Sequence, residues 1–425
     1  MPLQDPNVRW VVGAMILICA SASTVGCFTF LRKRALIGDA VAHAILPGIC
    51  LAFIFAQTKN PLVLLTGATL SGWLSIWLID LIVAHSKIKT DAALALILSV
   101  FYGIGILLLT VIQNSGNAAQ SGLDKFLFGS AAAMDQQDVI VFAIFSLLLL
   151  LVVFALFPQF RLIAFDRDFA QVRGFPVRRL EFTLSLLTVL AIAIGIQAVG
   201  VVLMAAFLIT PAAAARYWTH RLGVMILLAI CFAVGSGLAG TYISYVVPRM
   251  PTGPWIVTVL TFFTFFSVML GSRRGVVYAL LQQRKNRRKM LRENVLKCLY
   301  HLGEEDGNFQ RLRSREAMLE KRSFVPEKLE WSLRQLVRQG LVSRERGQAR
   351  LTAEGIEAGA RITRIHRLWE LYLTQYMKLP ADHVHEDAEA IEHIITPELE
   401  RELEDQLDYP RLDPHDRPIT YQKEP

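Results

Sequence analysis

The sequence predicts an all-α polytopic membrane protein joined to a charged, mainly helical domain. Apolar residues make up 53% of its 425 positions and charged residues only 19%, which is typical of a membrane protein rather than a soluble one. Residues 1–280 hold 18 Lys and Arg and 10 Asp and Glu, whereas residues 281–425 hold 26 basic and 26 acidic residues. We call these parts the membrane half and the tail. The tail is predicted to fold separately, in water.

Nine apolar runs in the membrane half have about the length of a transmembrane helix, which takes roughly 20 residues. They are 11–31, 37–56, 61–84, 92–112, 139–157, 182–198, 199–217, 224–246 and 254–270. Two of these runs meet at Gly200, so about nine helices are expected. The five cysteines show no CxxC spacing, which argues against a zinc ribbon or a disulfide framework.

The basic residues between the runs predict the orientation of the chain. Clusters of Lys and Arg follow every second run, and the alternate loops carry single basic residues. The clusters are Arg32 to Arg34; Lys87 and Lys89; Arg161, Arg167, Arg173, Arg178 and Arg179; Arg216 and Arg221; and Arg273 and Arg274. Because basic loops stay in the cytoplasm, the N-terminus is predicted outside and the tail inside the cell.

The second run carries two ionisable side chains. Asp39 and His43 are four residues apart, so they project from one face of a helix. A carboxylate at membrane depth normally faces a bundle interior or an aqueous path, and together with an imidazole it suits Mn²⁺, Fe²⁺ or Zn²⁺. From position alone, an interfacial pairing of Asp39 with the basic cluster at 32–34 is an equal alternative.

Two prolines predict interruptions of membrane helices. Pro47 and Gly48 follow His43 by one turn, and they predict a bend or break of the helix at membrane depth. Pro211, in the stretch "LITPAAAAR", predicts a second break beside small residues that favour close helix contact.

The longest basic loop, "RLIAFDRDFAQVRGFPVRRLEF", predicts a short amphipathic helix on the cytoplasmic side. Phe165, Phe169 and Val172 fall at helical spacing, acidic residues such as Asp166 lie between them, and Gly174 ends the pattern. Such a helix can lie on the bilayer surface. Its acidic residues and its length favour docking to a soluble partner.

Several stretches resemble a known family. "LIGDAVAHAILPGICLAF", "GLDKFLFGS", "AFDRDFAQVRGFPVRRLEF", "QAVGVVLMAAFLITPAAAAR" and "PTGPWIVTV" look like the manganese/zinc/iron permease subunits of ATP-binding-cassette importers. The resemblance implies a homodimeric permease of the bacterial inner membrane that receives a metal ion from an extracytoplasmic binding protein. It also implies that Asp39 and His43 line the ion path, and that a partner ATPase grips the loop around Phe165, Asp166, Phe169 and Gly174.

The chain is not predicted to be an enzyme. It contains no phosphate-binding GxxxxGK[ST] stretch, so ATP must be hydrolysed by a separate partner subunit.

The tail divides by charge. Residues 281–380 hold 22 basic and 12 acidic residues, and residues 381–425 hold 4 and 14. We expect a basic linker at 281–289, suited to anionic lipid headgroups, then a winged helix-turn-helix at 290–352 and a helical metal-binding and dimerisation domain at 353–425.

The winged helix-turn-helix is predicted from a helix at 290–302, two helices near 313–321 and 326–339, and two strand-like pieces about Gly347. The candidate DNA contacts on its recognition helix are Lys328, Arg334, Gln335 and Arg338. Glu327 and Glu330 lie in the first two turns of that helix and would repel phosphate. A protein-interaction or dimerisation role is therefore the alternative.

The acidic part of the tail carries interleaved histidines. His366 and Glu370 share one helical face, and the stretch "HEDAEAIEH" places further carboxylates and imidazoles on another. The latter residues are His385, Glu389, Glu392 and His393. Such spacing can form one or two divalent-metal sites, although acidic helices are usually solvated faces.

Together with "HRLWELYL" and "DPHDRPI", these residues resemble the diphtheria-toxin-repressor family of metal-dependent regulators from residue 290 to about 419. The resemblance implies that all six residues ligate metal, with Glu389 suited to the manganese-sensing branch. The first helix of that family also supplies ligands, but the nearest positions here are Asn294, Leu296 and Lys297. A protonated lysine cannot ligate, so this site is expected to be incomplete or rearranged.

These features predict the permease subunit of an ATP-driven importer of a divalent transition metal, with manganese favoured over iron and zinc. The tail is expected to be a cytoplasmic metal-sensing regulatory domain that gates transport or acts on DNA. The alternative is a membrane-tethered, metal-dependent transcription regulator whose transport half is degenerate.

Overall fold

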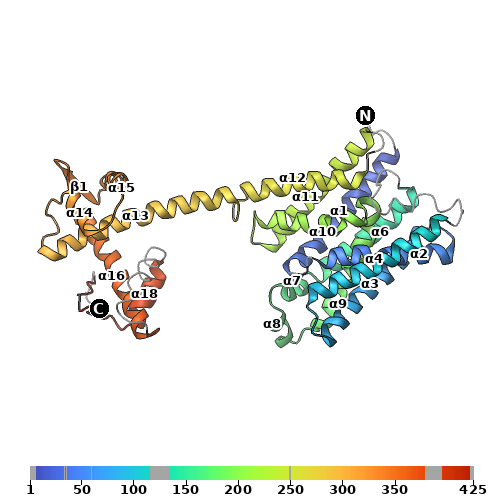
Figure 1. The fold of residues 1–425 in the computed structure, drawn as a ribbon, viewed down its shortest axis with the longest axis horizontal. Coiled ribbons are helices and arrows are strands. Elements are labelled where there is room, and N and C mark those ends of the chain that lie inside the picture. Colours follow the sequence, from blue (N-terminus) through green and yellow to red (C-terminus); the bar gives the residue numbers. More distant parts are fainter. Residues whose placement is uncertain are drawn as a thin grey trace. The chain divides into compact units, whose positions relative to one another are not determined.

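The computed structural model describes residues 6–421 except 33, 35, 59, 115–133, 248–249 and 379–394. The chain divides into two compact units that meet between Ala279 and Leu280, which correspond to the membrane half and the tail. Figure 1 labels their helices and strands. Each unit is described by itself.

The described residues of the membrane half form helices joined by short connections. Eight of these helices are long and apolar enough to cross a membrane, and α10 is a shorter apolar helix. The eight are α1 (Pro6–Leu31), α2 (Ile37–Ala56), α3 (Pro61–His85), α4 (Thr90–Asn114), α6 (Gln136–Ala155), α9 (Val177–Val199), α11 (Leu222–Val246) and α12 (Thr252–Leu270). With α10 (Val201–Arg216), they account for all nine predicted runs. The two short helices are α7 (Phe157–Phe165) and α8 (Arg167–Val172).

Local sequence signals set the starts of several helices. The Asn60 side chain accepts a hydrogen bond from the Leu62 backbone N–H at 3.0 Å, and Pro61 takes the first position of α3. Asp135 and Asp138 form a capping box at the start of α6. These side chains pair backbone N–H groups that have no partner within the helix.

The membrane helices are interrupted at Gly200 rather than at either proline. Gly200 has a φ of +92°, in the region that favours glycine, and it separates α9 from α10. The predicted break at Pro211 is wrong and α2 is not broken at Pro47, because α10 and α2 each continue through their proline, while a bend of α2 stays a prediction. The Ser71 hydroxyl of α3 donates to the Ala44 carbonyl of α2 at 2.6 Å, next to the His43 carbonyl that loses its helical N–H donor because of Pro47.

Gly48 allows α2 and α3 to approach closely. A Cβ atom placed on Gly48 would lie 2.2 Å from the Gly67 carbonyl oxygen, and one placed on Gly67 would lie 2.4 Å from the Gly48 carbonyl oxygen. Both distances are far shorter than a van der Waals contact. Small residues at these positions therefore bring two backbones together, as is common between membrane helices.

The helix that carries Asp39 and His43 lies inside the membrane half. Within their most apolar windows, α1, α9 and α2 are 72%, 67% and 61% buried, whereas α4 and α12 are only 22% buried. The apolar outer faces of α4 and α12 suit contact with lipid. The predicted ionisable pair is thus on a helix enclosed by protein.

The first part of the tail is a winged helix. α13 (Val276–Asp306) contains the predicted basic linker, and it is followed by α14 (Arg315–Lys321), α15 (Pro326–Arg338), β1 (Val342–Glu345) and β2 (Gln348–Leu351). The two strands pair antiparallel, with Glu345 opposite Gln348. Arg346 and Gly347 both have positive φ angles, as a two-residue hairpin turn requires.

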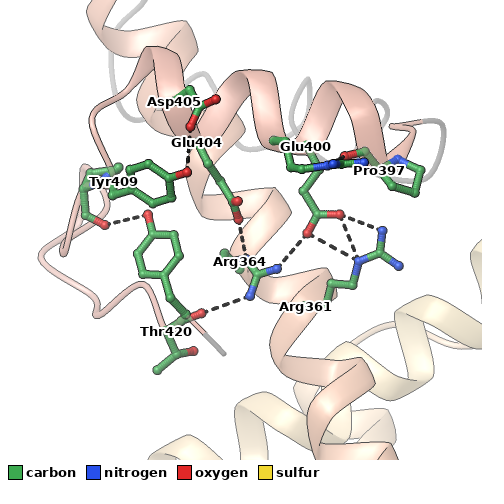
Figure 2. Close-up of polar contacts among 11 residues, drawn as sticks. Arg361, Arg364, Pro397, Glu400, Glu404, Asp405, Tyr409 and Thr420 are labelled. Atoms are coloured by element: carbon green, nitrogen blue, oxygen red, sulfur yellow. Dashed lines mark hydrogen bonds and ion pairs between the residues drawn. The ribbon is translucent and has the colours of Figure 1, made fainter. Parts of the chain in front are cut away.

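The second part of the tail is held by a cluster of ion pairs (Figure 2). It consists of α16 (Ala353–Gln375), α18 (Pro397–Gln406) and the following segment. Glu400 on α18 accepts hydrogen bonds from Arg361 at 2.6 Å and from Arg364 at 2.8 Å. Arg364 also pairs with Glu404 at 2.9 Å and donates to the Thr420 carbonyl at 3.3 Å. These contacts join α16 to α18 and to the C-terminal segment.

Candidate metal path, coupling helix and tail site

Asp39 and His43 lie side by side in the first two turns of α2. The His43 Nε2 atom is 3.5 Å from an Asp39 carboxylate oxygen. The Asp39 side chain is 42% exposed and the His43 side chain 14% exposed. Asp39 therefore faces an accessible space, while His43 is packed among helices, and the pair presents one carboxylate and one imidazole to the same place.

Tyr102 on α4 fixes the other side of His43. The two rings meet edge to face, with centroids 4.8 Å apart and an interplanar angle of 78°. The His43 Nδ1 atom is buried, and it has no hydrogen-bond partner among the described residues. No sequence pattern had pointed to Tyr102, because it lies on a different helix with ordinary apolar neighbours.

The described residues contain no group of three or more His, Cys, Asp or Glu side chains that could hold a metal ion. Among the described residues, Asp39 and His43 thus offer two candidate ligands within one chain. A site with few protein ligands suits an ion in passage, because a full set of ligands would hold the ion too firmly to release it.

The basic loop contains a short helix, as predicted, but it begins later than the apolar pattern indicates. Phe165 ends α7, and α8 begins at Arg167. The Asp166 side chain accepts a hydrogen bond from the Phe169 backbone N–H at 2.8 Å, so it caps α8. Gly174 has a φ of +80° and follows the helix, as predicted.

The outer face of this loop is apolar and exposed. Phe169 is 49% and Val172 is 85% exposed, and Phe165 is also exposed. Phe165 and Phe169 line a groove of about 380 Å³ together with Arg161, Arg173 and other residues of α7 and α8. Exposed aromatic side chains beside arginines are typical of the centre of a protein interface.

Glu181 connects the loop to the helix bundle. Its carboxylate lies 2.7 Å from the Arg32 guanidinium at the end of α1 and 3.3 Å from the Arg167 guanidinium at the start of α8. The side chains of Arg32 and Glu181 are largely buried. Sequence reasoning missed Glu181, although one signal was available, since it is the only glutamate among residues 1–280.

In the tail, the structure brings together His366 and Glu370. The His366 Nε2 atom is 3.0 Å from a Glu370 carboxylate oxygen, and both side chains are almost fully buried. The other four predicted ligands, His385, Glu389, Glu392 and His393, lie outside the described residues. The pairing of His366 with Glu370 across one turn of α16 agrees with the predicted shared face.

The α13 positions that the family resemblance assigns to this site do not fit a metal ion. Lys297 is buried, with 2% of its surface exposed, and a lysine ammonium has no lone pair to offer a cation. The Asn294 Oδ1 atom is buried without a hydrogen-bond partner among the described residues. Burial, together with the nearby charges of Lys297 and Arg367, lowers the pKa of His301 to about 3. Lys297 and Arg367 therefore place two cations near His301 on this face of α13.

The winged helix places its acidic residue Glu330 against an arginine. Arg344 on β1 donates two hydrogen bonds to the Glu330 carboxylate, at 2.5 and 2.9 Å. Of the candidate DNA contacts, Lys328 is exposed, and Gln335 lines an open basic groove with Arg288 of α13. Arg334 has its guanidinium 3.8 Å from Glu330, and Arg338 ends α15.

Comparison with known families identifies both parts of the chain. Residues 4–271 match the ABC 3 transport family. The chain belongs to the ABC 3 transport family. Residues 352–421 match the iron dependent repressor, metal binding and dimerisation domain. Both resemblances predicted from the sequence are thus confirmed, and this ABC 3 family member is a multi-pass membrane protein with a repressor-like domain after its spans.

Two relatives of this ABC 3 family member are named as metal transport proteins. It is 42% identical over 380 residues to the manganese transport system membrane protein MntC of Bacillus subtilis (strain 168), which covers 89% of this chain and 87% of that protein. It is 43% identical over 281 residues to the zinc transport system membrane protein TroC of Treponema pallidum (strain Nichols), which covers 66% of this chain and 94% of that protein. Among solved structures it is similar to PsaBC from Streptococcus pneumoniae in complex with Fab, with a TM-score of 0.59 and 29% identity. That match covers 66% of this chain and 96% of the other chain.

The two protein matches differ in how far they extend. The match to MntC is longer than the whole membrane half, so it includes most of the tail. The match to TroC takes up nearly all of that protein with two thirds of this chain. A tail is therefore not a constant part of the relatives of this ABC 3 family member.

Proposed function

We propose that this chain is the permease subunit of an ATP-driven importer of a divalent transition metal, and that Asp39 and His43 pass the ion through the membrane. The observation that carries the proposal is their position, side by side on a helix enclosed by protein. Ionisable side chains in a membrane segment are costly, and they normally face a bundle interior or a water-filled cavity and mark a path for ions. The names of the related proteins are consistent with this role.

Manganese is the favoured ion, with iron and zinc as the other candidates. An oxygen and an imidazole nitrogen accept all three divalent ions, and MntC is named for manganese transport. A homodimer would supply a second Asp39 and His43 across a two-fold axis. Two copies of a two-ligand site provide enough side chains to replace part of the hydration shell of the ion, while each copy alone binds it weakly.

The partner ATPase is proposed to dock on α8 and the adjoining groove, through Phe165, Phe169 and Val172. Glu181 offers a route from that docking site to the ion path. It contacts Arg167 beside α8 and Arg32 at the end of α1, and the next helix along the chain carries Asp39. Movement of α8 against the bundle would be transmitted to α1 through this shared carboxylate. The second partner is an extracytoplasmic metal-binding protein.

The tail is proposed to be a cytoplasmic regulatory domain of the transporter. Its absence from the length matched in TroC is consistent with an added regulatory role rather than a part in conduction. A DNA-binding role of the tail is the second candidate. It is favoured by the Arg344 contact to Glu330, because this ion pair neutralises an acidic group on the recognition helix.

Metal uptake tests the proposed ion path. Cells without their own manganese importers would express the chain with its ATPase and its binding protein, and their uptake of radioactive Mn²⁺ would be measured. We expect the double variant Asp39→Ala, His43→Ala to lose uptake while reaching the membrane in normal amounts. A matched double variant, His85→Ala with Asp91→Ala, removes the same two side-chain types from exposed positions at the ends of α3 and α4.

The matched variant should retain uptake. Normal uptake by the Asp39→Ala, His43→Ala variant would refute the ion path. Loss of uptake in both variants would show that removing any Asp and His side chains disturbs assembly of the transporter. That result would also contradict a specific role for the pair on α2.

A further inference from the structure

Lys297 is the only lysine that is buried among the described residues. It lies in the middle of a fully buried stretch of α13, Val295 to Tyr300, whose other members are apolar or aromatic or cysteine. Moving an ammonium group from water into a protein interior is strongly unfavourable unless anionic or polar groups surround it. A lysine at this position therefore needs a specific reason.

The face of α13 that carries Lys297 packs against α16. Asn294, Lys297 and His301 are spaced by three and four residues, so they share one face. Arg367 on α16 donates two hydrogen bonds to Glu304 on α13, both at 2.9 Å. A Cβ atom on Gly359 of α16 would lie 3.0 Å from the Cβ atom of Tyr300 on α13, so the two helices are in close contact.

The residues at this contact are those expected of a metal site, except for the ones on α13. His366 and Glu370 on α16 supply an imidazole and a carboxylate. A metal ion at this site would also require a carboxylate or an unprotonated nitrogen on α13. The structure has instead a neutral amide at Asn294 and a cation at Lys297.

We propose that the Lys297 ammonium is the permanent cation of this site, and that it joins α13 to α16 in place of a divalent metal. The ammonium occupies the interior permanently because it is covalently attached to α13, and its three N–H donors can satisfy the polar oxygen atoms around it. Glu370, the described carboxylate of this site, then serves as a partner of the lysine instead of a metal ligand. The tail of this chain consequently holds its fold without metal, and Mn²⁺ at cytoplasmic concentrations does not alter it at this site.

This proposal goes beyond the proposed transport function and is independent of it. It also opposes the sequence prediction that the tail senses metal through His366, Glu370 and the four ligands outside the described residues. Binding of Mn²⁺ by the tail therefore distinguishes the two.

Hydrogen–deuterium exchange followed by mass spectrometry of the full chain in lipid nanodiscs is the direct test, since it reports on each helix separately. Exchange would be measured in α13 and α16 with and without Mn²⁺ alone. We expect the natural chain to show no Mn²⁺-dependent change in these helices. In Lys297→Glu, which exchanges the cation for a ligand, Mn²⁺ at about ten times its dissociation constant should slow exchange of α13 and α16 about tenfold.

Two further variants make the result decisive. Lys285→Glu makes the same charge change at an exposed position of α13, and it should leave these helices insensitive to Mn²⁺. If Lys297→Glu does not fold, Lys297→His, which replaces the ammonium by an imidazole nitrogen, should gain Mn²⁺ protection instead. The proposal is overturned if the natural chain is protected by Mn²⁺ in α13 and α16. It is also overturned if neither Lys297 variant gains protection. Exchange in α2 reports on the ion path separately, so failure of one proposal does not imply failure of the other.

Discussion

The contact between Gly48 and Gly67 allows a sharp prediction about the helix that carries the ion path. Changing Gly48→Ala adds one methyl group on the face of α2 that meets α3. That methyl carbon would lie 2.2 Å from the Gly67 carbonyl oxygen and 2.5 Å from the Ser71 Cβ atom, whereas ordinary contacts begin near 3.4 Å. The obstructing atoms are backbone and Cβ atoms, which cannot rotate away. The helices must separate by about 1 Å, as the difference between these distances shows.

The size of the effect follows from two opposing contributions. Overpacking of a tight contact costs about 1–3 kcal/mol. Alanine is favoured over glycine within a helix by up to about 1 kcal/mol, which offsets part of this cost. We therefore expect a net loss of about 1–2 kcal/mol in the free energy of unfolding, which corresponds to a melting temperature lower by roughly 2–8 °C. Mn²⁺ uptake should also fall, because α2 carries Asp39 and His43.

The assay is thermal unfolding of the purified full chain in detergent, together with metal uptake in cells. Gly103→Ala is the matched control, because a Cβ atom on Gly103 of α4 would meet nothing within 4 Å. This control should leave both quantities unchanged or raise the melting temperature slightly. Equal melting temperatures for the two variants would show that the α2 and α3 backbones are not in close contact.

Three further predictions concern the coupling loop and the tail. Glu181→Gln should reduce Mn²⁺ uptake about tenfold while the partner ATPase still binds, because only the shared ion pair is lost. Asp168→Asn, at an exposed position of α8, should leave uptake unchanged. Equal uptake by the two variants would exclude the coupling route. Phe169→Ala should weaken co-purification of the ATPase by about 10–100-fold, because burying one phenylalanine contributes about this much. Phe154→Ala, at an exposed position of α6, should not weaken it, and unchanged binding by Phe169→Ala would remove α8 from the interface. Burial raises the pKa of Glu400, but the hydrogen bonds from Arg361 and Arg364 outweigh it, and the net pKa lies below its ordinary value. Stability from this carboxylate is therefore present above its ordinary pKa and is lost as pH falls through the folded-state pKa. Glu400→Gln should destabilise the tail by about 2–4 kcal/mol at neutral pH, and the variant should lose less stability than the natural chain on acidification. Hydrogen exchange of α16 and α18 measures both effects. An unchanged loss of stability on acidification would contradict this role of Glu400.

The positions of the membrane helices were predictable because they depend on local properties. The length of each apolar run and the basic clusters between runs are read directly from the chain, and all nine runs are helical in the structure. The closeness of the Asp39 and His43 side chains to each other was predictable for the same reason, since a spacing of four residues places two side chains together in any α-helix. The start of α8 was less predictable, because the capping by Asp166 overrides the apolar pattern that begins at Phe165.

The sequence by itself determined the arrangement of a helical membrane half followed by a charged tail, and it identified the ionisable pair on α2. Only the tertiary structure decided what Gly48, Glu181 and Lys297 do. Gly48 looked like a helix breaker, but it serves as a contact point for Gly67. Glu181 pairs with Arg32, 149 residues away, and Lys297 is buried on α13, whose Tyr300 meets Gly359 of α16. These roles depend on which helix surfaces pack together. The free energy of that packing comes from residues that are far apart in the sequence, so no short stretch of the chain predicts it.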